Sequence, residues 1–490
     1  VGSVRTVIFN WLFARQNDGQ FILRIEDTDR TRYEPETILT LLEGLRWMGL
    51  DWDEGPDVEG LKRSGVENAD AYAVGGPRGP YIQSERLPLY RKVAAELLER
   101  GWAYRCNCTP ERLEQVRAEQ RARKETPMYD RHCRNLPPDA VSPDDPNAVV
   151  RLKVPLEGET SFHDVIKGDI VYENRMIDDQ VLLKSDGYPT YHLAVVVDDH
   201  LMEVTHIARA DEWLPSTPKH ILLYEAMGWE LPIYCHVPLV MGQDGKKLSK
   251  RHGATAIEQF RQQGYLPEAL FNYLALLGWA PGEGDEQEIF TREELIERFD
   301  LFRVNKAAAA FSYKKLDWMN GVYIRNLPEE ALLARLLPFW QAAGFVPDPC
   351  PADVRERLRP VVPLVQERLK RLDEIVAWTA FLFRDVAPPS AEKLVGKKMS
   401  PAESLEALRR VRKLLAEIEP FEPEAMEQPM RDLAAELGIK AGPLFGIVRW
   451  AVTGQKVAPP LFGSLAIVGR EDVLARLDAA EETLAAHPDL

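Results

Sequence analysis

The chain has 490 residues, of which 45% are hydrophobic, and a formal net charge of −16. Its length predicts about three to five domains. Its composition excludes a wholly disordered protein. No apolar run approaches the ~20 residues of a bilayer span, which excludes a membrane-spanning protein. The negative net charge argues against a nucleic-acid-binding protein that is basic overall, but it does not exclude one that binds through a local basic surface. The five cysteines show no disulfide framework, which favours the reducing cytoplasm.

The N-terminal region reads as alternating helices and strands. Apolar residues at helical spacing predict a helix over residues 4–15, and alternation predicts a strand over 21–25 that runs into "EDTDR". Because chemistry in open α/β sheets lies beyond the carboxyl ends of strands, Glu26, Asp27 and Asp29 are candidates for holding an ammonium group or a metal. Capping of a helix start by Asp27 or Thr28 is the alternative. A second amphipathic helix spans 38–48.

The next part of the chain changes its pattern twice. Residues 55–80 are rich in Gly, Pro and charge and predict an expanded loop, after which Pro88 starts another helix. Short strand-like pieces and turns over about 102–195 indicate an inserted domain. Helix–strand alternation then resumes, with Asp198 and Asp199 after a β-branched strand, where capping or loop fixing competes with substrate contact.

Beyond about residue 256 the pattern is mostly helical. The stretch "LPEALFNYLALLGW" predicts one clear helix, and "PEEALLARLLPFWQAAG" and "SLEALRRVRKLLAEI" predict others. We therefore expect a multidomain α/β plus all-α protein: a split α/β domain, an insertion, and a helical C-terminal half of one or two domains.

Positive charge is concentrated in "DGKKLSKRHGA", residues 244–254, which follows an apolar run bounded by Pro232 and Gly242 that predicts a strand. The alternative without a function is a solvent-exposed turn, which is what most basic clusters are. The functional one is a clamp in which Lys247, Ser249 and Lys250 present positive charge to a triphosphate and neutralise departing pyrophosphate. The order of a Walker loop is absent, which favours a different nucleotide-using fold.

The cysteines suggest a second kind of site. Cys106 and Cys108 form a C-x-C pair, and Cys133 lies near Tyr129 and His132 in the sequence. Thiolates at this spacing suit a structural zinc ion if a fourth ligand is present, and free buried thiols are the alternative. Cys235 and Cys350 read as isolated packing residues. A nucleophilic triad is not evident, which favours catalysis by positioned charge.

Taken together, these stretches resemble the bacterial-type glutamyl-tRNA synthetases, a family of class I aminoacyl-tRNA synthetases. The resemblance covers essentially the whole chain and rests on motifs in the expected order: "FILRIEDTDR", "GPYIQSERLPLY", "LLKSDGYPTYHLA", "VVDDHLM", "KKLSKRHGA", "LPEALFNYLALLGW" and "LDWMNGVYI". It implies ATP-dependent activation of L-glutamate to glutamyl-adenylate, often with Mg²⁺, and transfer to the 3′-terminal adenosine of tRNA(Glu). We expect a cytoplasmic monomer.

The resemblance also implies a domain order. We expect a Rossmann-like catalytic domain in two halves, 1–101 and 196–255, separated by an α+β acceptor-binding domain over 102–195. A helical stem-contact domain over 256–325 and a helical anticodon-binding region over 326–490 would follow.

Functional residues carry over from the family motifs. Lys247-Leu248-Ser249-Lys250-Arg251 resembles the KMSKS signature, so Lys247 and Lys250 would be catalytic and, with Ser249, would bind ATP. "VGSVRT" resembles the end of the HIGH signature, with Gly2 at its glycine position. The first histidine of that signature would precede Val1, so the sequence is expected to begin inside the motif.

The remaining implied residues bind glutamate, tRNA and zinc. Glu26 would hold the ammonium of glutamate, and Tyr191 and Arg209 would line its site, a surface ion pair of Arg209 with Asp211 or Glu212 being the alternative. Arg368 would read an anticodon base, or lie on a solvated helix face. The zinc pattern of some relatives implies the ligands Cys106, Cys108, Tyr129 and Cys133, although Asn135 stands where others have a histidine.

Two features depart from the family pattern or stay open. Residues 59–75 resemble an insertion without an assigned function, and "RRVRK" (409–413) would either contact phosphates or simply be exposed.

Two alternative functions remain. The nearest is a glutaminyl-tRNA synthetase, which is disfavoured because the anticodon region of that family is mainly β-barrel. A catalytically inactive tRNA-binding protein is the alternative from another class.

Overall fold

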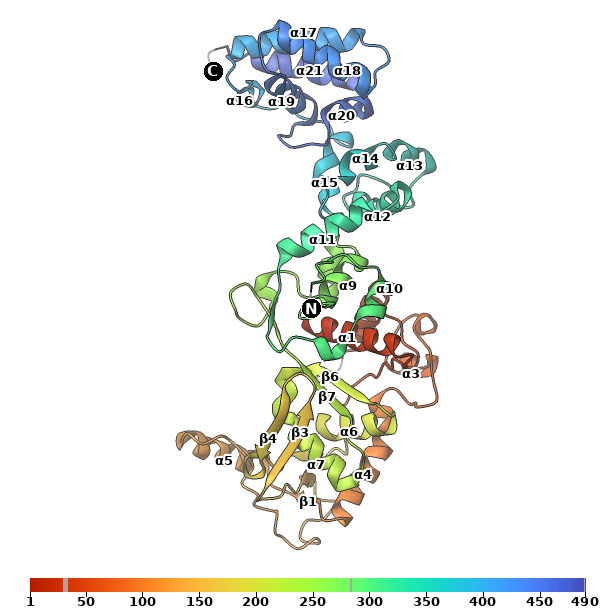
Figure 1. Cartoon of the computed structure of the whole chain (residues 1–490), viewed down its shortest axis with the longest axis vertical. Helices are drawn as coiled ribbons and strands as arrows, with labels where there is room; N and C mark the ends of the chain where they lie inside the picture. The colour runs from red at the N-terminus through yellow and green to blue at the C-terminus, as the bar shows by residue number, and fades with distance from the viewer. Residues whose placement is uncertain (30–33, 283, 489) are drawn as a thin grey trace. The chain divides into compact units, whose positions relative to one another are not determined.

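A computed structural model describes residues 1–29, 34–282, 284–488 and 490, and the side chain of Lys250 lies outside the described part. The chain divides into two compact units. Unit 1 comprises Val1–Glu258 and Leu270–Ser312, and unit 2 comprises Gln259–Ala269 and Tyr313–Leu490. Figure 1 traces the elements of both units along the chain.

Unit 1 is a mixture of helices and short strands. Its helices are α1 (Gly2–Gln16), α2 (Pro35–Trp47), α3 (Val58–Arg63), α4 (Leu87–Glu99), α5 (Pro110–Ala122), α6 (Tyr191–Leu201), α7 (Thr217–Met227) and α10 (Arg292–Arg298). Its strands are β1 (Ala103–Cys106), β2 (Val149–Leu152), β3 (Glu159–Asp164), β4 (Gly168–Glu173), β5 (Val181–Leu183), β6 (His206–Ala210), β7 (Ile233–Val237), β8 (Val240–Met241) and β9 (Ala309–Ala310). The predicted α/β character of this part is confirmed.

One sheet in unit 1 has the strand order β4-β3-β7-β6 (Figure 1). Strands β6 and β7 are parallel and joined through α7, and their register places Arg209 opposite His236. Strand β3 runs parallel to β7, with Asp164 opposite Tyr234, and pairs antiparallel with β4. This register brings polar side chains from β3, β6 and β7 to one end of the sheet, as open α/β sheets do at their ligand sites.

The prediction of a strand before Asp198 and Asp199 was wrong, because this segment forms helix α6. Residues Leu193–Asp199 are all buried, packed in a core with α4, α7 and the sheet β1-β2-β5. A helix buried on every side has no polar face, so its sequence shows no 3.6-residue period and its β-branched residues resemble a strand.

The predicted strand over 21–25 is extended but forms isolated parallel bridges, Ile22 to Glu54 and Ile25 to Ile82. The backbone N–H of Leu23 donates to the carbonyl of Glu54 at 2.8 Å. A regular strand does not develop here because the partner at Ile82 turns at once into the 3₁₀ turn Gln83–Arg86.

Residues 59–75 are packed rather than loose. They contain α3, whose start is capped by the Asp57 carboxylate accepting from the N–H of Gly60. Leu61, Val66 and Ala69 are buried against Ile25 and Leu42, so this segment contributes apolar surface that shields the strand-like segment at 21–25 from water.

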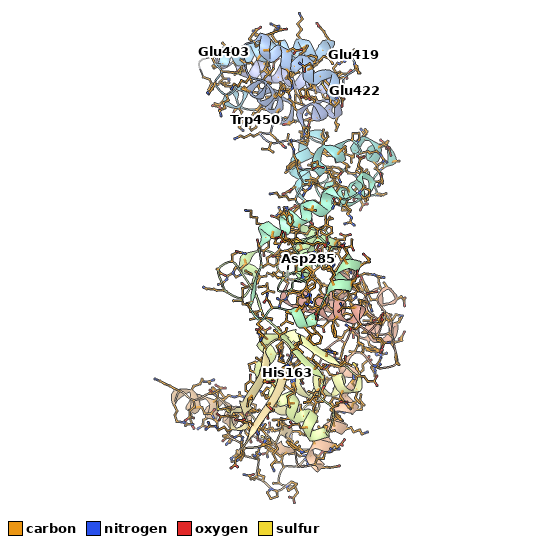
Figure 2. All side chains as sticks on the ribbon, viewed as in Figure 1. His163, Asp285, Glu403, Glu419, Glu422 and Trp450 are labelled. Carbon is orange, nitrogen blue, oxygen red and sulfur yellow. The ribbon has the colours of Figure 1, made fainter. Side chains whose placement is uncertain are left out.

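Unit 2 is helical among its described residues, as predicted. Helices α8 (Ile257–Gln262) and α9 (Pro267–Ala275) each contain a boundary with unit 1, and the others are α11 (Tyr313–Arg325), α12 (Glu329–Ala342), α13 (Ala352–Leu358), α14 (Val361–Gln366), α15 (Glu374–Thr379), α16 (Ala391–Leu394), α17 (Pro401–Glu417), α18 (Pro423–Glu436), α19 (Ala441–Thr453), α20 (Leu461–Val468) and α21 (Arg470–Ala485). Ser400 and Glu403 form a capping box at the start of α17, and Figure 2 labels Glu403 there.

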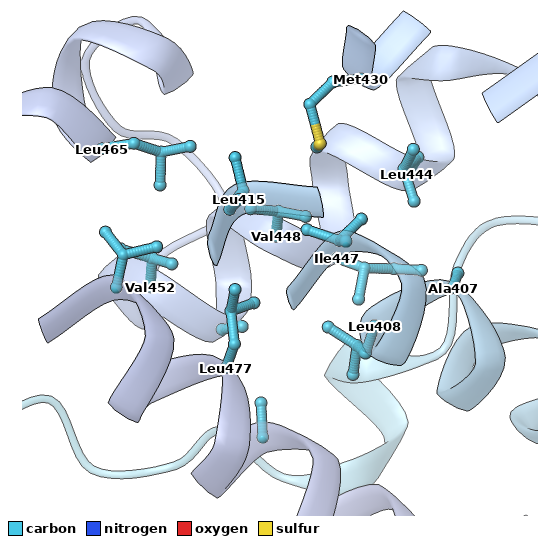
Figure 3. Close-up of a cluster of buried hydrophobic side chains, with 14 of the residues drawn as sticks. Ala407, Leu408, Leu415, Met430, Leu444, Ile447, Val448, Val452, Leu465 and Leu477 are labelled. Carbon is cyan, nitrogen blue, oxygen red and sulfur yellow. The ribbon is translucent and has the colours of Figure 1, made fainter. Parts of the chain in front are cut away.

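Amphipathic helices close the core of the C-terminal bundle. Leu408 and Leu415 of α17 point toward Ile447 and Val448 of α19 and Leu477 of α21 (Figure 3). Residues seven positions apart on one helix face meet the same neighbours, which is the pattern the sequence shows in "SLEALRRVRKLLAEI".

The five-part domain division from the sequence stays a prediction. The hairpin β3–β4, within the expected insertion 102–195, shares its sheet with β6 and β7 of the expected second catalytic half. Among the described residues, none of the helices has both the length and the apolar character needed to cross a lipid bilayer.

Candidate active site

The basic segment predicted after a strand begins with a tight hairpin. Strand β7 is followed by β8, and a turn is closed by the N–H of Gly242 donating to the carbonyl of Lys246 at 2.7 Å. The N–H of Leu248 returns to the carbonyl of Val240 at 3.0 Å, and the N–H of Ser249 donates to Nδ1 of His252, also at 3.0 Å. The apolar run and the loop lie where the sequence predicts them.

A cavity of about 460 Å³ lies beside this loop, within unit 1. Its lining includes Gly2 and Ser3 of α1, Arg209 and Trp213 around the end of β6, and Lys247 with Glu212. Three predicted site residues from distant parts of the chain therefore meet at one cavity. Three cationic side chains line the cavity, those of Arg5, Arg209 and Lys247. Together with the start of a helix, they suit a ligand that carries several negative charges.

The start of α1 leaves room for an anion close to the backbone. An added Cβ at Gly2 would find no atom within 4 Å, so the space beside the helix start is open at this position. Unpaired N–H groups and the helix dipole favour phosphate oxygens. The ATP-binding role of Gly2 stays a prediction.

Lys247 is the loop lysine that lines the cavity, and its ammonium pairs with Glu212, Nζ to Oε2 at 2.5 Å. Ser249 is exposed, and the Lys250 side chain lies outside the described residues. The roles of these three residues stay predictions.

Arg209, on β6, does not form the surface ion pair that was the alternative. Asp211 pairs with Lys167 at 3.1 Å, and Glu212 pairs with Lys247. The Arg209 guanidinium instead faces neutral groups: Nε donates to Nε2 of His236 at 3.1 Å and Nη2 donates to the hydroxyl of Thr217 at 2.9 Å.

Tyr191, the first residue of α6, interacts electrostatically with the other two predicted glutamate-binding residues. Its ring packs on Trp213 with centroids 4.7 Å apart. Burial raises the pKa of the Tyr191 phenol, while the Arg209 charge lowers it and the Glu26 charge raises it. The phenol therefore lies within electrostatic reach of both groups, so the structure brings Glu26, Tyr191 and Arg209 into one neighbourhood.

Glu26 is held by Arg24, whose guanidinium lies 2.9 Å from the Glu26 carboxylate and 2.9 Å from that of Asp199. Burial raises the pKa of Asp199 to about 6, although Arg24 opposes the shift. Arg24 thus orients two carboxylates at the end of the extended segment, and part of the Glu26 side chain stays exposed.

Two other acidic candidates, Asp27 and Asp198, make contacts within the fold. Asp27 accepts from the N–H of Ser84 at 2.8 Å, so this contact ties two loops together. Asp198 is fully buried and accepts from Arg86 at 2.7 Å and from the hydroxyl of Tyr90 at 2.7 Å. These contacts of Asp198 agree with the alternative interpretation, in which its carboxylate fixes neighbouring segments of the fold.

The predicted zinc ligands also lie together in unit 1. The sulfur atoms of Cys106, Cys108 and Cys133 are all within 4.8 Å of one another, and the Tyr129 hydroxyl lies 3.3 Å from the Cys106 sulfur and 3.5 Å from that of Cys108. Burial opposes ionisation of Cys106, but hydrogen bonds, led by that of Tyr129, lower its pKa overall. Burial raises the pKa of Cys108 to about 11.

This cluster fits a tetrahedral zinc ion. Zinc–sulfur bonds of about 2.3 Å place the sulfur atoms of a tetrahedral site about 3.8 Å apart, and the Cys108 and Cys133 sulfur atoms are separated by 3.6 Å. Within the described part of the chain, it is the one group of three or more His, Cys, Asp or Glu side chains with metal-binding spacing. Three thiolates and the Tyr129 phenolate would hold the ion.

Comparison with known proteins decides the family. Residues 1–318 match the family model "tRNA synthetases class I (E and Q), catalytic domain", and residues 331–481 match "Anticodon binding domain". The chain belongs to the class I (E and Q) tRNA synthetases. The resemblance read from the sequence motifs is confirmed, and so are the class I catalytic fold and the activity class, a ligase that forms aminoacyl-tRNA.

The relatives of this synthetase are similar along nearly its whole length. The glutamate–tRNA ligase of Dehalococcoides mccartyi strain BAV1 is 48% identical over 488 residues, which cover 100% of this chain and 96% of the relative. That of Borreliella burgdorferi is 43% identical, covering 99% and 96%. A crystal structure of a glutamate tRNA ligase from Elizabethkingia meningosepticum, in complex with its amino acid, superimposes with a TM-score of 0.82 at 34% identity, covering 99% and 96%.

The anticodon-binding part of the synthetase contains an arginine pair that the sequence analysis found only in part. Arg368 is exposed just after α14, and its charge lowers the pKa of Arg449 on α19, after burial as the main cause. In the described part of the chain neither guanidinium forms an ion pair. Two like charges without an acidic partner are compatible with an external anion, and the tRNA-binding role of Arg368 stays a prediction.

The "RRVRK" run of the synthetase is instead paired internally. Arg409 contacts Glu481 at 2.7 Å, Arg410 contacts Glu436 at 2.9 Å, and Arg412 contacts Asp478 at 2.7 Å. These partners favour the exposed helix face over the phosphate-binding interpretation.

Sequence reasoning missed the groups that surround Arg209 in the synthetase. Thr217 and His220 lie three residues apart on α7 and so share a helix face. This spacing is only a weak sequence signal for a functional site. His236 is placed opposite Arg209 by sheet register alone.

Proposed function

We propose that this protein is a glutamate–tRNA ligase, which activates L-glutamate with ATP and transfers it to the 3′-terminal adenosine of tRNA(Glu). The observation that carries this proposal is the cavity shared by Arg209, for an acidic amino acid, and by Lys247 and Gly2, for phosphates. The family membership and the names of the full-length relatives support it.

In the first step, an oxygen of the glutamate α-carboxylate attacks the α-phosphorus of ATP and the bond to pyrophosphate breaks. Charge builds up on the leaving diphosphate, so catalysis needs positioning and positive charge more than a nucleophile. We assign the neutralising role to Lys247 and Lys250, with Ser249 and the backbone near Gly2 holding phosphate oxygens.

The amino acid would lie between Glu26 and Arg209. The Glu26 carboxylate would accept from the substrate ammonium, and Arg209 would pair with the side-chain carboxylate near the Tyr191 phenol. Opposite charges at two ends of the pocket select a substrate with both an ammonium and a second carboxylate.

In the second step, a ribose hydroxyl of the terminal adenosine takes the glutamyl group and AMP leaves. The tRNA would reach the enzyme through the region 102–195 at its acceptor end and through Arg368 and Arg449 at its anticodon. Both arginines offer the planar donor set that suits bases and phosphates.

Metal ions would have separate roles. Because no carboxylate cluster with metal-binding spacing occurs among the described residues, Mg²⁺ would enter with the ATP phosphates rather than in a protein cage. Zinc on Cys106, Cys108, Tyr129 and Cys133 would tie β1 to the loop at 129–133 as a structural ion. We infer a monomer that works in the cytoplasm, where tRNA charging takes place.

An aminoacylation assay with purified tRNA(Glu) and tRNA(Gln), each with labelled glutamate or glutamine, tests the proposal. Charging of tRNA(Glu) with glutamate is the expected result. Charging with glutamine would instead indicate a glutaminyl-tRNA synthetase, and tRNA binding without charging would indicate an inactive tRNA-binding protein. Glutamate on both tRNAs would show an enzyme that does not discriminate between them.

A further inference from the structure

The guanidinium of Arg209 is surrounded by neutral acceptors from two neighbouring elements. His236 of β7 accepts from Nε at 3.1 Å, Thr217 of α7 accepts from Nη2 at 2.9 Å, and Nδ1 of His220, one turn along α7, lies 3.3 Å from Nη1. Because a guanidinium has only donors, both imidazole nitrogens that face it must carry lone pairs.

The protonation of His236 is set from its other side. Asp164 of β3 places Oδ2 2.7 Å from Nδ1 of His236 and 2.9 Å from its backbone N–H. The proton therefore lies on Nδ1, and Nε2 is left to accept from Arg209. Burial lowers the pKa of His236, although Asp164 opposes the shift, and this direction favours the neutral ring. The ring also keeps the Asp164 carboxylate one imidazole away from the Arg209 charge.

A second histidine extends the same arrangement. With Nδ1 of His220 facing Arg209, its proton lies on Nε2, which is 3.0 Å from Nδ1 of His192 on α6. Burial lowers the pKa of His220 well below its ordinary value and that of His192 to about 4. Both rings are therefore neutral near pH 7, and the pair is a fixed chain of donor and acceptor.

Carboxylates close to Arg209 in the sequence are occupied elsewhere. Asp211 pairs with Lys167 and Glu212 with Lys247, and in the described part of the chain no carboxylate pairs with Arg209. The guanidinium is thus oriented without an anionic partner. An ion pair inside the protein would have used the charge that an acidic substrate needs.

We propose that His236 and His220 are positioning residues, which orient Arg209 through neutral acceptors and so reserve its charge for the side-chain carboxylate of the amino acid. This inference rests on the proposed function. Discrimination between glutamate and glutamine depends on a positive charge that no protein group compensates. We therefore assign the preference for glutamate to Arg209 and to the neutrality of the groups around it.

A pair of variants at Thr217 tests the neutrality directly. Thr217 is the first residue of α7, where an acidic side chain is compatible with the helix dipole. Thr217→Asp puts a carboxylate beside Arg209, and Thr217→Asn has nearly the same shape without charge. In glutamate-dependent ATP–pyrophosphate exchange with tRNA present, we expect the KM for glutamate to be about tenfold or more higher in the Asp variant than in the Asn variant.

We expect the two Thr217 variants to have the same KM for ATP and the same thermal unfolding temperature. The preference for glutamate over glutamine is expected to be lower in the Asp variant. Equal KM values for glutamate in the two variants would overturn the inference. A wild-type enzyme that does not use glutamate at all would instead contradict the proposed function, so the two failures are distinguishable.

A second set of variants tests positioning by His236. His236→Leu removes both ring nitrogens and should raise the KM for glutamate about tenfold while leaving that for ATP. His236→Gln restores an acceptor near Nε2 and should recover part of the loss. His163→Gln, an exposed change on neighbouring β3 (Figure 2), is the control. Equal effects on both substrates, or no recovery with Gln, would show that the ring serves packing alone.

Discussion

Lys247 and Glu212 both line the cavity and form an ion pair, with Nζ 2.5 Å from Oε2. About half of each side chain is exposed, at 58% and 46%. Exposed pairs contribute only about 0–1 kcal/mol to stability, so the ammonium can exchange Glu212 for phosphate oxygens at little cost. A weak internal partner keeps the lysine near the cavity without holding it there.

Lys247→Met should therefore slow adenylate formation without destabilising the protein. Loss of one group that stabilises transition-state charge costs about 2–4 kcal/mol, or about 30- to 1,000-fold in rate. Pyrophosphate exchange measures this effect, with thermal unfolding and tRNA binding unchanged. Lys246→Met, at the exposed neighbouring lysine that does not line the cavity, is the matched control. Equal rates for the two variants would contradict the role of Lys247, and the same assay applies to Lys250→Ala.

Cys106→Ser should abolish zinc binding. The buried Cys106 sulfur lies against the Tyr129 hydroxyl, and a structural zinc site needs its four ligands for high affinity. Metal analysis of the purified protein is expected to give one zinc per wild-type chain and none in the variant. Cys350→Ser, outside the cluster, should keep the metal. Zinc-free wild-type protein would contradict the site.

Arg368→Ala should raise the KM for tRNA and leave pyrophosphate exchange at saturating tRNA nearly unchanged. If Arg368 meets a phosphate, the salt dependence of tRNA binding should also fall by about one unit of slope. Arg359→Ala is the control, because Arg359 already pairs with Glu330 and Glu356. Identical tRNA affinity in both variants and wild type would show that Arg368 is only a solvated residue.

His192 should make the protein less stable in acid. Burial lowers its pKa from 6.5 to about 4, and between these values the unfolded chain binds a proton that the folded chain does not. The stability from this group is therefore lost as the pH falls from about 6.5 to about 4, by up to about 1.4 kcal/mol per pH unit.

Urea unfolding of wild type and His192→Gln across this pH range checks the prediction. The difference in unfolding free energy should grow with pH, because the variant lacks the titrating ring. His163→Gln, at an exposed histidine, should follow the wild type. A difference that is constant from pH 4 to 7 would contradict the assignment to His192.

Much of the fold followed from local patterns. The amphipathic helices of unit 2 were predictable because each has one apolar face, as Leu408 and Leu415 illustrate. The helix α6 was not, because burial on all sides removes that signal. The extended segment at 21–25 was recognised, but its reduction to single bridges depends on partners at Glu54 and Ile82.

What the amino-acid sequence determined by itself is the chemistry available: a lysine-rich loop after a strand, closely spaced cysteines, and an ordered set of family motifs. These are local, so they can be read without coordinates. What only the tertiary structure decided is the electrostatic surroundings of Arg209. Asp164 and His236 are 72 positions apart, and sheet register alone places the ring between that carboxylate and the guanidinium. A charge acts through distance and burial, and both are properties of the folded chain.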